Sequence, residues 1–87
     1  MSMAQKRFTF SDLKDILVNR IGVPESQVID DPNMTFEDMD LDSLALVEIQ
    51  LAVQQQYGFS IPDEDTHYIT TIGQAIEYTN RRLQEQG

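Results

Sequence analysis

Apolar side chains recur at the three- and four-residue spacing of an amphipathic helix in three segments of the chain. In the first segment these positions are Phe10, Leu13, Ile16, Leu17 and Ile21. Thr9 and Asp12 match a capping-box pattern at its start. Gly22 and the following Pro24 are typical of a helix end, because glycine adopts the left-handed cap and proline cannot continue a helix. The pattern therefore predicts a helix over 10–21.

The second segment is apolar over a wider arc than a one-sided surface helix needs. Its apolar positions are Leu44, Leu46, Val47, Ile49, Leu51, Val53 and Tyr57. Asp42 suits the N-cap, because its carboxylate can accept hydrogen bonds from the first free backbone N–H groups. Gly58 ends the pattern. We expect a helix here whose broad apolar arc packs against several other helices.

The C-terminal part of the chain predicts an extended link, a short helical turn and a last helix. The link is 59–62 and the turn is 63–67. Thr71 and Gln74 match a capping box at the start of the last helix. Its expected core face consists of Ile72, Ala75, Ile76, Thr79 and Leu83.

These segments predict an all-α fold, a small antiparallel bundle of three main helices plus one short helix, since no stretch shows strand alternation. A long loop, from about Val23 to Leu41, separates the first and second helices. The side chains expected to anchor it are Val28, Ile29, Met34 and Phe36. A chain of 87 residues has room for one domain. We expect it over 9–84, with an N-terminal tail over 1–8 and a C-terminal tail over 85–87.

Charge is distributed unevenly along the chain. The formal net charge is −9, and no Lys or Arg lies between Ile21 and Asn80. A nucleic-acid binder needs a positive surface, and an anionic membrane would repel this chain, so we expect neither partner. Two interpretations of the acidic stretch remain open. It is either a solvated face that keeps the protein soluble, or a field that steers basic partners.

Cysteine usage and apolar run length exclude further classes. The chain has no Cys, which excludes disulfides, thiolate zinc sites and a cysteine nucleophile. The longest apolar run, 44–47, is too short to span a membrane, and the N-terminus lacks a secretory pattern. We expect a cytoplasmic monomer.

Two catalytic or metal-binding interpretations of the region around Ser43 match its residues poorly. Asp38, Asp40 and Asp42 have the spacing of the first ligands of a calcium loop, but Ser43 stands at the sixth position, where Gly is needed. Ile49 stands at the twelfth, where a bidentate Glu is needed. A hydrolase would have to pair Ser43 with the single histidine, His67, and the sequence has no Gly-x-Ser-x-Gly elbow. We therefore expect no metal site and no catalytic residue.

Without any family resemblance, the residues around Ser43 allow two interpretations. A phosphate ester on Ser43 would lie at the positive end of the helix dipole, close to free N–H groups. Asp40 and Asp42 would repel such a phosphate. Alternatively, Asp42 and Ser43 only begin the helix, a place where serine is common.

Two stretches resemble the acyl carrier protein family. Residues 38–48, Asp-Met-Asp-Leu-Asp-Ser-Leu-Ala-Leu-Val-Glu, are similar to the carrier motif. Residues 57–65, Tyr-Gly-Phe-Ser-Ile-Pro-Asp-Glu-Asp, and then 69–72 resemble the same family at the expected distance. The likeness extends over about 8–83. Within the family, the string Asp-Ser-Leu-Ala-Leu-x-Glu looks most like stand-alone carriers of bacterial type II (aromatic) polyketide synthases.

The resemblance implies a specific function. Ser43 would carry a 4′-phosphopantetheine arm, transferred from coenzyme A by a phosphopantetheinyl transferase, and the thiol of the arm would hold acyl groups as thioesters. Asp42 would help to position magnesium and coenzyme A during loading. The partner-docking residues would be Leu44, Val47, Glu48, Glu37, Asp38, Asp40 and Glu64. The partners would be a ketosynthase, an acyltransferase and tailoring enzymes with basic docking surfaces. Leu46, Ile61 and Ile69 would line the space for an acyl chain, or would be ordinary core.

This sequence departs from the family at several positions. Asp40 stands where glycine is usual, which predicts a stiffer and more acidic turn. Gln54, Gln55 and Gln56 occupy a region that is often acidic in fatty-acid carriers, and Ala45 stands where those carriers commonly have an acid. Three hypotheses remain: an acyl carrier of polyketide or of fatty-acid synthesis, an acidic helical adaptor without covalent cargo, and a small hydrolase.

Overall fold

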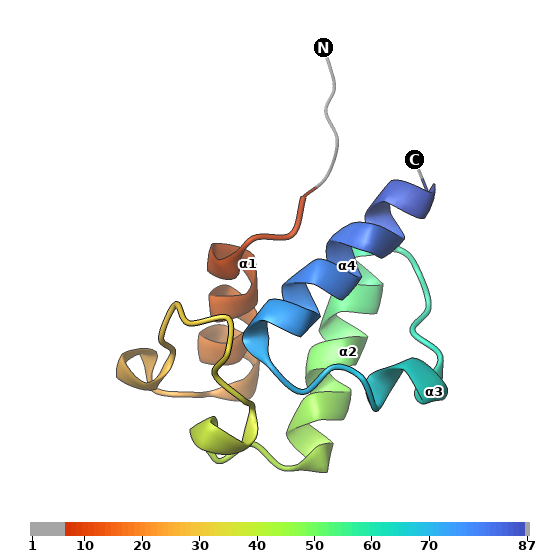
Figure 1. Ribbon diagram of the computed structural model, residues 1–87. Coiled ribbons are helices and arrows are strands. Elements are labelled where there is room, and N and C mark those ends of the chain that lie inside the picture. The colour runs from red at the N-terminus through yellow and green to blue at the C-terminus, as the bar shows by residue number, and fades with distance from the viewer. Residues whose placement is uncertain (1–6, 87) are drawn as a thin grey trace.

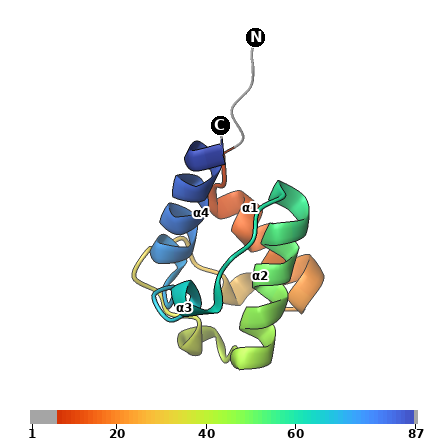
Figure 2. The same cartoon turned by 90° about the vertical axis from the view of Figure 1, so that its right-hand side faces the viewer.

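The computed structural model describes residues 7–86, and the chain forms a bundle of four helices (Figure 1). The helices are α1 (Phe10–Asp15), which continues as a π-helix (Ile16–Ile21), α2 (Ser43–Tyr57), α3 (Asp63–Thr66) and α4 (Ile72–Gln86). Two 3-10 turns, Glu25–Gln27 and Glu37–Met39, lie in the loop between α1 and α2. α1 runs opposite to α2 and α4 (Figure 2). The predicted all-α bundle with one short helix and a long first loop is confirmed.

The signals at both ends of the first helix act as predicted. The side chain of Thr9 accepts from the Asp12 N–H, and the Asp12 carboxylate accepts from the Thr9 N–H at 2.9 Å. At the other end Gly22 is left-handed, with φ 93°. The carbonyl of Leu17 accepts from the N–H groups of both Gly22 and Val23, at 3.0 and 2.9 Å. This double acceptance closes the helix with a π-helical turn that the apolar spacing does not encode.

The core extends beyond the expected domain boundary at the N-terminus. Phe8, which we expected in the tail, is 1% exposed, and its ring meets that of Tyr57 edge to face at 5.6 Å. The side chain of Asn80 also accepts from the Phe8 N–H and donates to the Phe8 carbonyl. The tail prediction is therefore wrong at Phe8. Residues 1–6 and 87 of the expected tails lie outside the described residues.

Backbone hydrogen bonds hold the long loop against the start of α4. The Gly73 N–H donates to the Pro32 carbonyl at 3.0 Å and the Ile72 N–H to the Met34 carbonyl at 3.0 Å. The Phe36 N–H donates to the Thr70 carbonyl at 3.1 Å. We call these three hydrogen bonds the loop clamp.

The loop anchors are only partly those predicted. Val28 and Phe36 are buried and Met34 is half-buried, but Ile29 is 56% exposed, so its prediction is wrong. Val28 has extended dihedral angles, and neighbouring side chains of an extended segment point to opposite sides. Only one of Val28 and Ile29 can therefore face the core. Val23 and Met39 are buried anchors that the prediction omitted.

The broad apolar arc of α2 divides into two faces. Ile49, Ala52 and Val53 are buried in the core. On the other side, Leu44, Val47 and Leu51 are large apolar side chains exposed to solvent. The breadth of the arc therefore reflects both core packing and exposure, and of the exposed residues Leu44 and Val47 were predicted for docking, whereas Leu51 was not. One face holds the bundle together, and the other is an exposed apolar stripe, defined by Leu44, Val47 and Leu51.

The last helix begins and packs as predicted. The Gln74 N–H donates to the hydroxyl of Thr71 at 3.1 Å, and the side-chain oxygen of Gln74 accepts from the Thr71 N–H. Ile72, Ala75 and Thr79 are buried. α4 continues to Gln86, through Glu85, which we expected in the C-terminal tail.

We predict that Gly73→Ala destabilises the protein, although alanine normally stabilises a helix relative to glycine by about 1 kcal/mol. A Cβ at Gly73 would lie 2.8 Å from the Pro32 Cβ and 2.9 Å from the Pro32 carbonyl oxygen. Such crowding typically costs about 1–3 kcal/mol. Urea unfolding measures the change. Ser11, the second residue of α1, supplies the control, since Ser11→Ala should be more stable than Ser11→Gly. A Gly73→Ala variant as stable as the original protein would contradict this account.

Candidate functional site

Ser43 is the first residue of α2 and is exposed to solvent. Asp42 is the N-cap, and its Oδ1 accepts from the Ala45 N–H at 2.9 Å. Within residues 7–86, the hydroxyl of Ser43 and the N–H groups of Ser43 and Leu44 have no hydrogen-bond partner. The start of α2 thus presents a free hydroxyl next to two free donors at the positive end of a 15-residue helix.

The turn before α2 has a left-handed residue that is not glycine. Asp40 has φ 59° and ψ 32°, a conformation that aspartate tolerates better than most residues. Thr35 and Asp38 fix the 3-10 turn before it, because each side chain accepts from the other residue's N–H. The Leu41 N–H then donates to the Phe36 carbonyl at 3.2 Å. The family's usual glycine at this position matches the left-handed conformation, and the aspartate adds a charge next to Ser43.

The docking residues predicted on α2 share one face of the helix. Leu44 is 69% exposed, Val47 is 47% exposed, and Glu48 is also exposed. Val47 and Glu48 lie three and four positions after Leu44, so both side chains are neighbours of Leu44 on the helix surface. Leu51 continues this face and is 46% exposed. The sequence did not lead us to predict Leu51 at the surface, although it stands seven positions after Leu44 and four after Val47, on the same helix face.

The predicted acidic docking residues are also at the surface. Glu37, Asp38 and Asp40 are exposed in the turn that leads into α2. Glu64 is exposed on α3, a separate helix that follows α2 along the chain. The acids before Ser43 and the acid on α3 therefore belong to two different elements.

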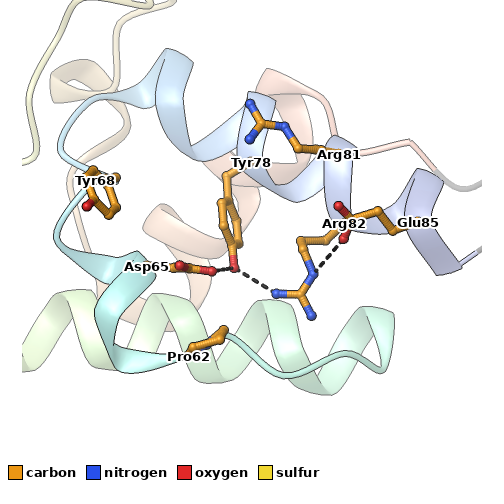
Figure 3. Close-up of a pocket in the computed structure, with 7 residues that line it drawn as sticks. All are labelled: Pro62, Asp65, Tyr68, Tyr78, Arg81, Arg82 and Glu85. Atoms are coloured by element: carbon orange, nitrogen blue, oxygen red, sulfur yellow. Dashed lines mark hydrogen bonds and ion pairs between the residues drawn. The ribbon is translucent and has the colours of Figure 1, made fainter.

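The predicted acyl-chain residues Leu46, Ile61 and Ile69 are half-buried and pack against the core. In the structure, the link between α2 and α3 is 58–62. None of the three residues lines the open pocket that lies between this link, α3 and α4 (Figure 3). That pocket has a volume of about 450 Å³. Its lining consists of Pro62, Asp65, Tyr68, Tyr78, Arg81, Arg82 and Glu85.

A chain of polar contacts crosses this pocket. The Tyr78 hydroxyl donates to Asp65 Oδ2 at 2.6 Å and accepts from Arg82 Nη1 at 2.8 Å. Burial raises the pKa of Tyr78, and its hydrogen bond to Asp65 raises it further, while Arg82 acts in the opposite direction. The phenol therefore stays protonated at neutral pH and remains a donor to Asp65.

Residues 7–86 contain no assembled site for hydrolysis by Ser43 and His67 or for a metal ion. His67 is exposed at the end of α3, and no hydrogen bond joins it to Ser43. In the same part of the chain, no group of three or more Asp, Glu or His side chains is placed to hold a metal ion. None of the described helices is long and apolar enough to cross a membrane.

A comparison with protein families covers most of this bundle, including the start of α2. A family model described as the phosphopantetheine attachment site matches residues 11–79. The chain therefore belongs to the phosphopantetheine-binding family.

Solved structures from one synthase resemble the whole chain. Butyryl acyl carrier protein of the actinorhodin polyketide synthase of Streptomyces coelicolor is 31% identical, with a TM-score of 0.78, over 94% of this chain and 98% of that chain. The 3,5-dioxohexyl and 3-oxo-butyl forms of the carrier of that synthase are 30% identical, with TM-scores of 0.81. In both cases the match covers 97% of this chain and 100% of the other.

The protein is thus an acyl carrier protein, a carrier without catalysis of its own, and its cofactor is covalently attached 4′-phosphopantetheine. The start of α2 fits this group, because an exposed hydroxyl and two free N–H donors are present there. When bound, the group supplies the thiol that a chain without cysteine lacks.

We predict that Asp42→Ala lowers the free energy of unfolding by about 1 kcal/mol, because the Ala45 N–H loses its acceptor. Asp42→Asn should leave stability nearly unchanged, since asparagine caps about as well as aspartate. Urea unfolding followed by circular dichroism measures both. An equal loss in the two variants would show that the charge of Asp42, and not its role as acceptor, stabilises α2.

Proposed function

We propose that this carrier holds growing polyketide intermediates as thioesters on a 4′-phosphopantetheine arm attached to Ser43. The observation that carries the proposal is the free, exposed hydroxyl of Ser43 at the capped start of α2. The likeness to actinorhodin synthase carriers over nearly the whole chain favours polyketide over fatty-acid synthesis. Ala45 also favours polyketide synthesis, because fatty-acid carriers commonly have an acid at this position.

Loading uses this chain's residues in separate roles. The Oγ of Ser43 forms a bond to the phosphorus next to the pantetheine of coenzyme A, and 3′,5′-ADP leaves as the bond to that phosphorus breaks. The proton of the Ser43 hydroxyl passes to a base of the phosphopantetheinyl transferase. Oδ1 of Asp42 is engaged in capping, so its other oxygen is free to bind the magnesium that accompanies coenzyme A.

Delivery requires partners to bind and release quickly. The exposed apolar stripe supplies a small contact area, and Glu48 with Glu37, Asp38, Asp40 and Glu64 supplies charge around it. Because charge raises association rates more than affinity, this combination suits short encounters. We propose ketosynthase, acyltransferase and tailoring enzymes with basic surfaces as the partners, and the cytoplasm as the compartment.

The acyl chain has a proposed shelter. Leu46, Ile61 and Ile69 are half-buried and pack against the core, and Ile61 and Ile69 flank α3 along the chain. Since empty apolar cavities are costly, a space between them would be closed without an acyl chain. These three residues remain a prediction.

The attachment site is tested by weighing the protein after incubation with coenzyme A, magnesium and a promiscuous phosphopantetheinyl transferase. The original chain should gain the mass of one phosphopantetheine, and Ser43→Ala should gain none. Ser60→Ala, which removes another exposed serine, should load like the original chain. Failure of the original chain to load, under conditions that load a control carrier, would favour the adaptor without covalent cargo.

Charge on α2 should act mainly on the association rate. We predict that Glu48→Gln slows association with a ketosynthase of an aromatic polyketide synthase by about twofold to fivefold at low salt. Raising the salt concentration should remove most of the difference. Asp30→Asn, which removes an exposed acid of the long loop, is the control and should have little effect. Stopped-flow measurements give the association rates at each salt concentration. An association rate independent of salt would contradict electrostatic steering.

A further inference from the structure

α3 is too short to be stable by itself. It has four residues, no side-chain cap and no buried side chain. Its backbone hydrogen bonds are local, such as the Asp65 N–H to the Pro62 carbonyl and the Tyr68 N–H to the Asp65 carbonyl. Isolated helices of this length are not stable in water, so contacts with other elements must hold α3 in place.

The segment that contains α3 is tied down on both sides of it. Before α3, the Ile61 N–H donates to the side-chain oxygen of Gln54 at 2.7 Å. After α3, the N–H and hydroxyl groups of Thr70 donate to the side-chain oxygen of Gln74, both at 2.8 Å. Together with the packing of Ile61 and Ile69 against the core, these contacts fix the chain before and after α3, but none of them is made by a side chain of α3 itself.

One side-chain contact fixes α3 itself. The hydrogen bond from Tyr78 to Asp65 is the only one in residues 7–86 that joins a side chain of α3 to another helix (Figure 3). Of the three acids of α3, Asp65 is half-buried, whereas Asp63 and Glu64 are exposed. Asp65 faces α4, and its two neighbours face solvent.

Arg82 supports this contact from the side of α4. Its guanidinium donates to the Tyr78 oxygen at 2.8 Å and forms an ion pair with Glu85 at 3.4 Å. It also lies over the ring of Phe59, 5.1 Å from the centroid. The Arg82 side chain is 24% exposed, and partial removal of water strengthens a cation–π contact. Arg82 therefore connects Phe59, a buried residue of the 58–62 link, to the Tyr78 hydroxyl, which binds Asp65 of α3.

The contact lies along an open pocket and not within packed core. Asp65, Tyr78, Arg82 and Glu85 all line the pocket of about 450 Å³ (Figure 3). Breaking the hydrogen bond between Tyr78 and Asp65 would therefore release α3 without opening the apolar core. Local opening of this kind costs far less than global unfolding.

We infer that Asp65, Tyr78 and Arg82 form a latch that positions α3, and with it the exposed carboxylate of Glu64, for contact with basic partner enzymes. Tyr78 and Arg82 act as positioning residues, since they hold α3 and do not belong to the docking face. The inference rests on the proposed docking function of Glu64. Loss of the latch leaves the charge of α3 in place but lets its direction vary.

The first test measures whether Tyr78 holds α3. Tyr78→Phe should raise amide exchange at Tyr68 and Ile69 by about tenfold in NMR measurements, because a charge-assisted hydrogen bond is lost. Amides of α1 and α2 should be unchanged. Tyr68→Phe is the matched control, since Tyr68 is 75% exposed and its hydroxyl has no partner in residues 7–86. Unchanged exchange in Tyr78→Phe would overturn the latch.

Two substitutions of Asp65 distinguish the effect of its hydrogen bond from the effect of its packing. Asp65→Asn keeps an acceptor for the Tyr78 hydroxyl and should raise exchange less than Asp65→Ala does. Equal rises in the two variants would show that the hydrogen bond does not hold α3, and would overturn the latch.

The second test asks whether the latch positions Glu64. We expect Glu64→Gln to raise the KM of a phosphopantetheinyl transferase for this carrier about threefold, with kcat unchanged. In the Tyr78→Phe background the same substitution should have almost no effect on KM. An equal effect in both backgrounds would overturn the positioning role. No effect of Glu64→Gln in the original chain would instead refute docking at Glu64, while the exchange experiment would still decide the latch.

Discussion

The loop clamp between 32–36 and 70–73 is the constraint on which the position of Ser43, the proposed attachment site, depends. It fixes a long connection at its middle, so that Phe36 and Met39 enter the core and the chain turns into α2 directly afterwards. The close approach of Gly73 to Pro32 is part of the clamp, since a larger residue would separate the two backbones. The side chain of Ser43 has no hydrogen-bond partner within residues 7–86 that could hold it. Its location follows from the clamp, the left-handed turn at Asp40 and the Asp42 cap.

Features encoded by neighbouring residues were predicted from the sequence, and features set by distant contacts were not. Capping at Asp42 and Thr71 uses residues three positions apart, so the starts of α2 and α4 were identified correctly. The core role of Phe8 depends on Asn80 and Tyr57, far away in the sequence. Ile29 was misplaced because hydrophobicity does not say which of two neighbours in an extended segment faces the core. The attachment serine was proposed from a local motif and remains a prediction, whereas the pocket beside α3 depends on how two consecutive elements, α3 and α4, pack.

The two faces of α2 explain why a small protein can be both a stable fold and a docking module. Ile49, Ala52 and Val53 bury one face of α2, which contacts the π-helix that continues α1. The residues of the opposite face are exposed and not part of the core, so core packing does not restrict which side chains can stand there. α3 differs, because it contributes nothing to the core and depends on polar contacts. Stability and recognition are thereby assigned to separate surfaces of the molecule.

The exposed apolar stripe has a consequence for the protein at high concentration. Leu44, Val47 and Leu51 would be a site of self-association on a neutral protein, since exposed apolar surface favours pairing. On this chain, two copies that met stripe to stripe would bring Glu48 of each into the same interface, on molecules that each carry a net charge of −9. Like charges in such an interface cost free energy. The acids around the stripe therefore oppose the pairing of two copies through it, although the stripe itself is apolar.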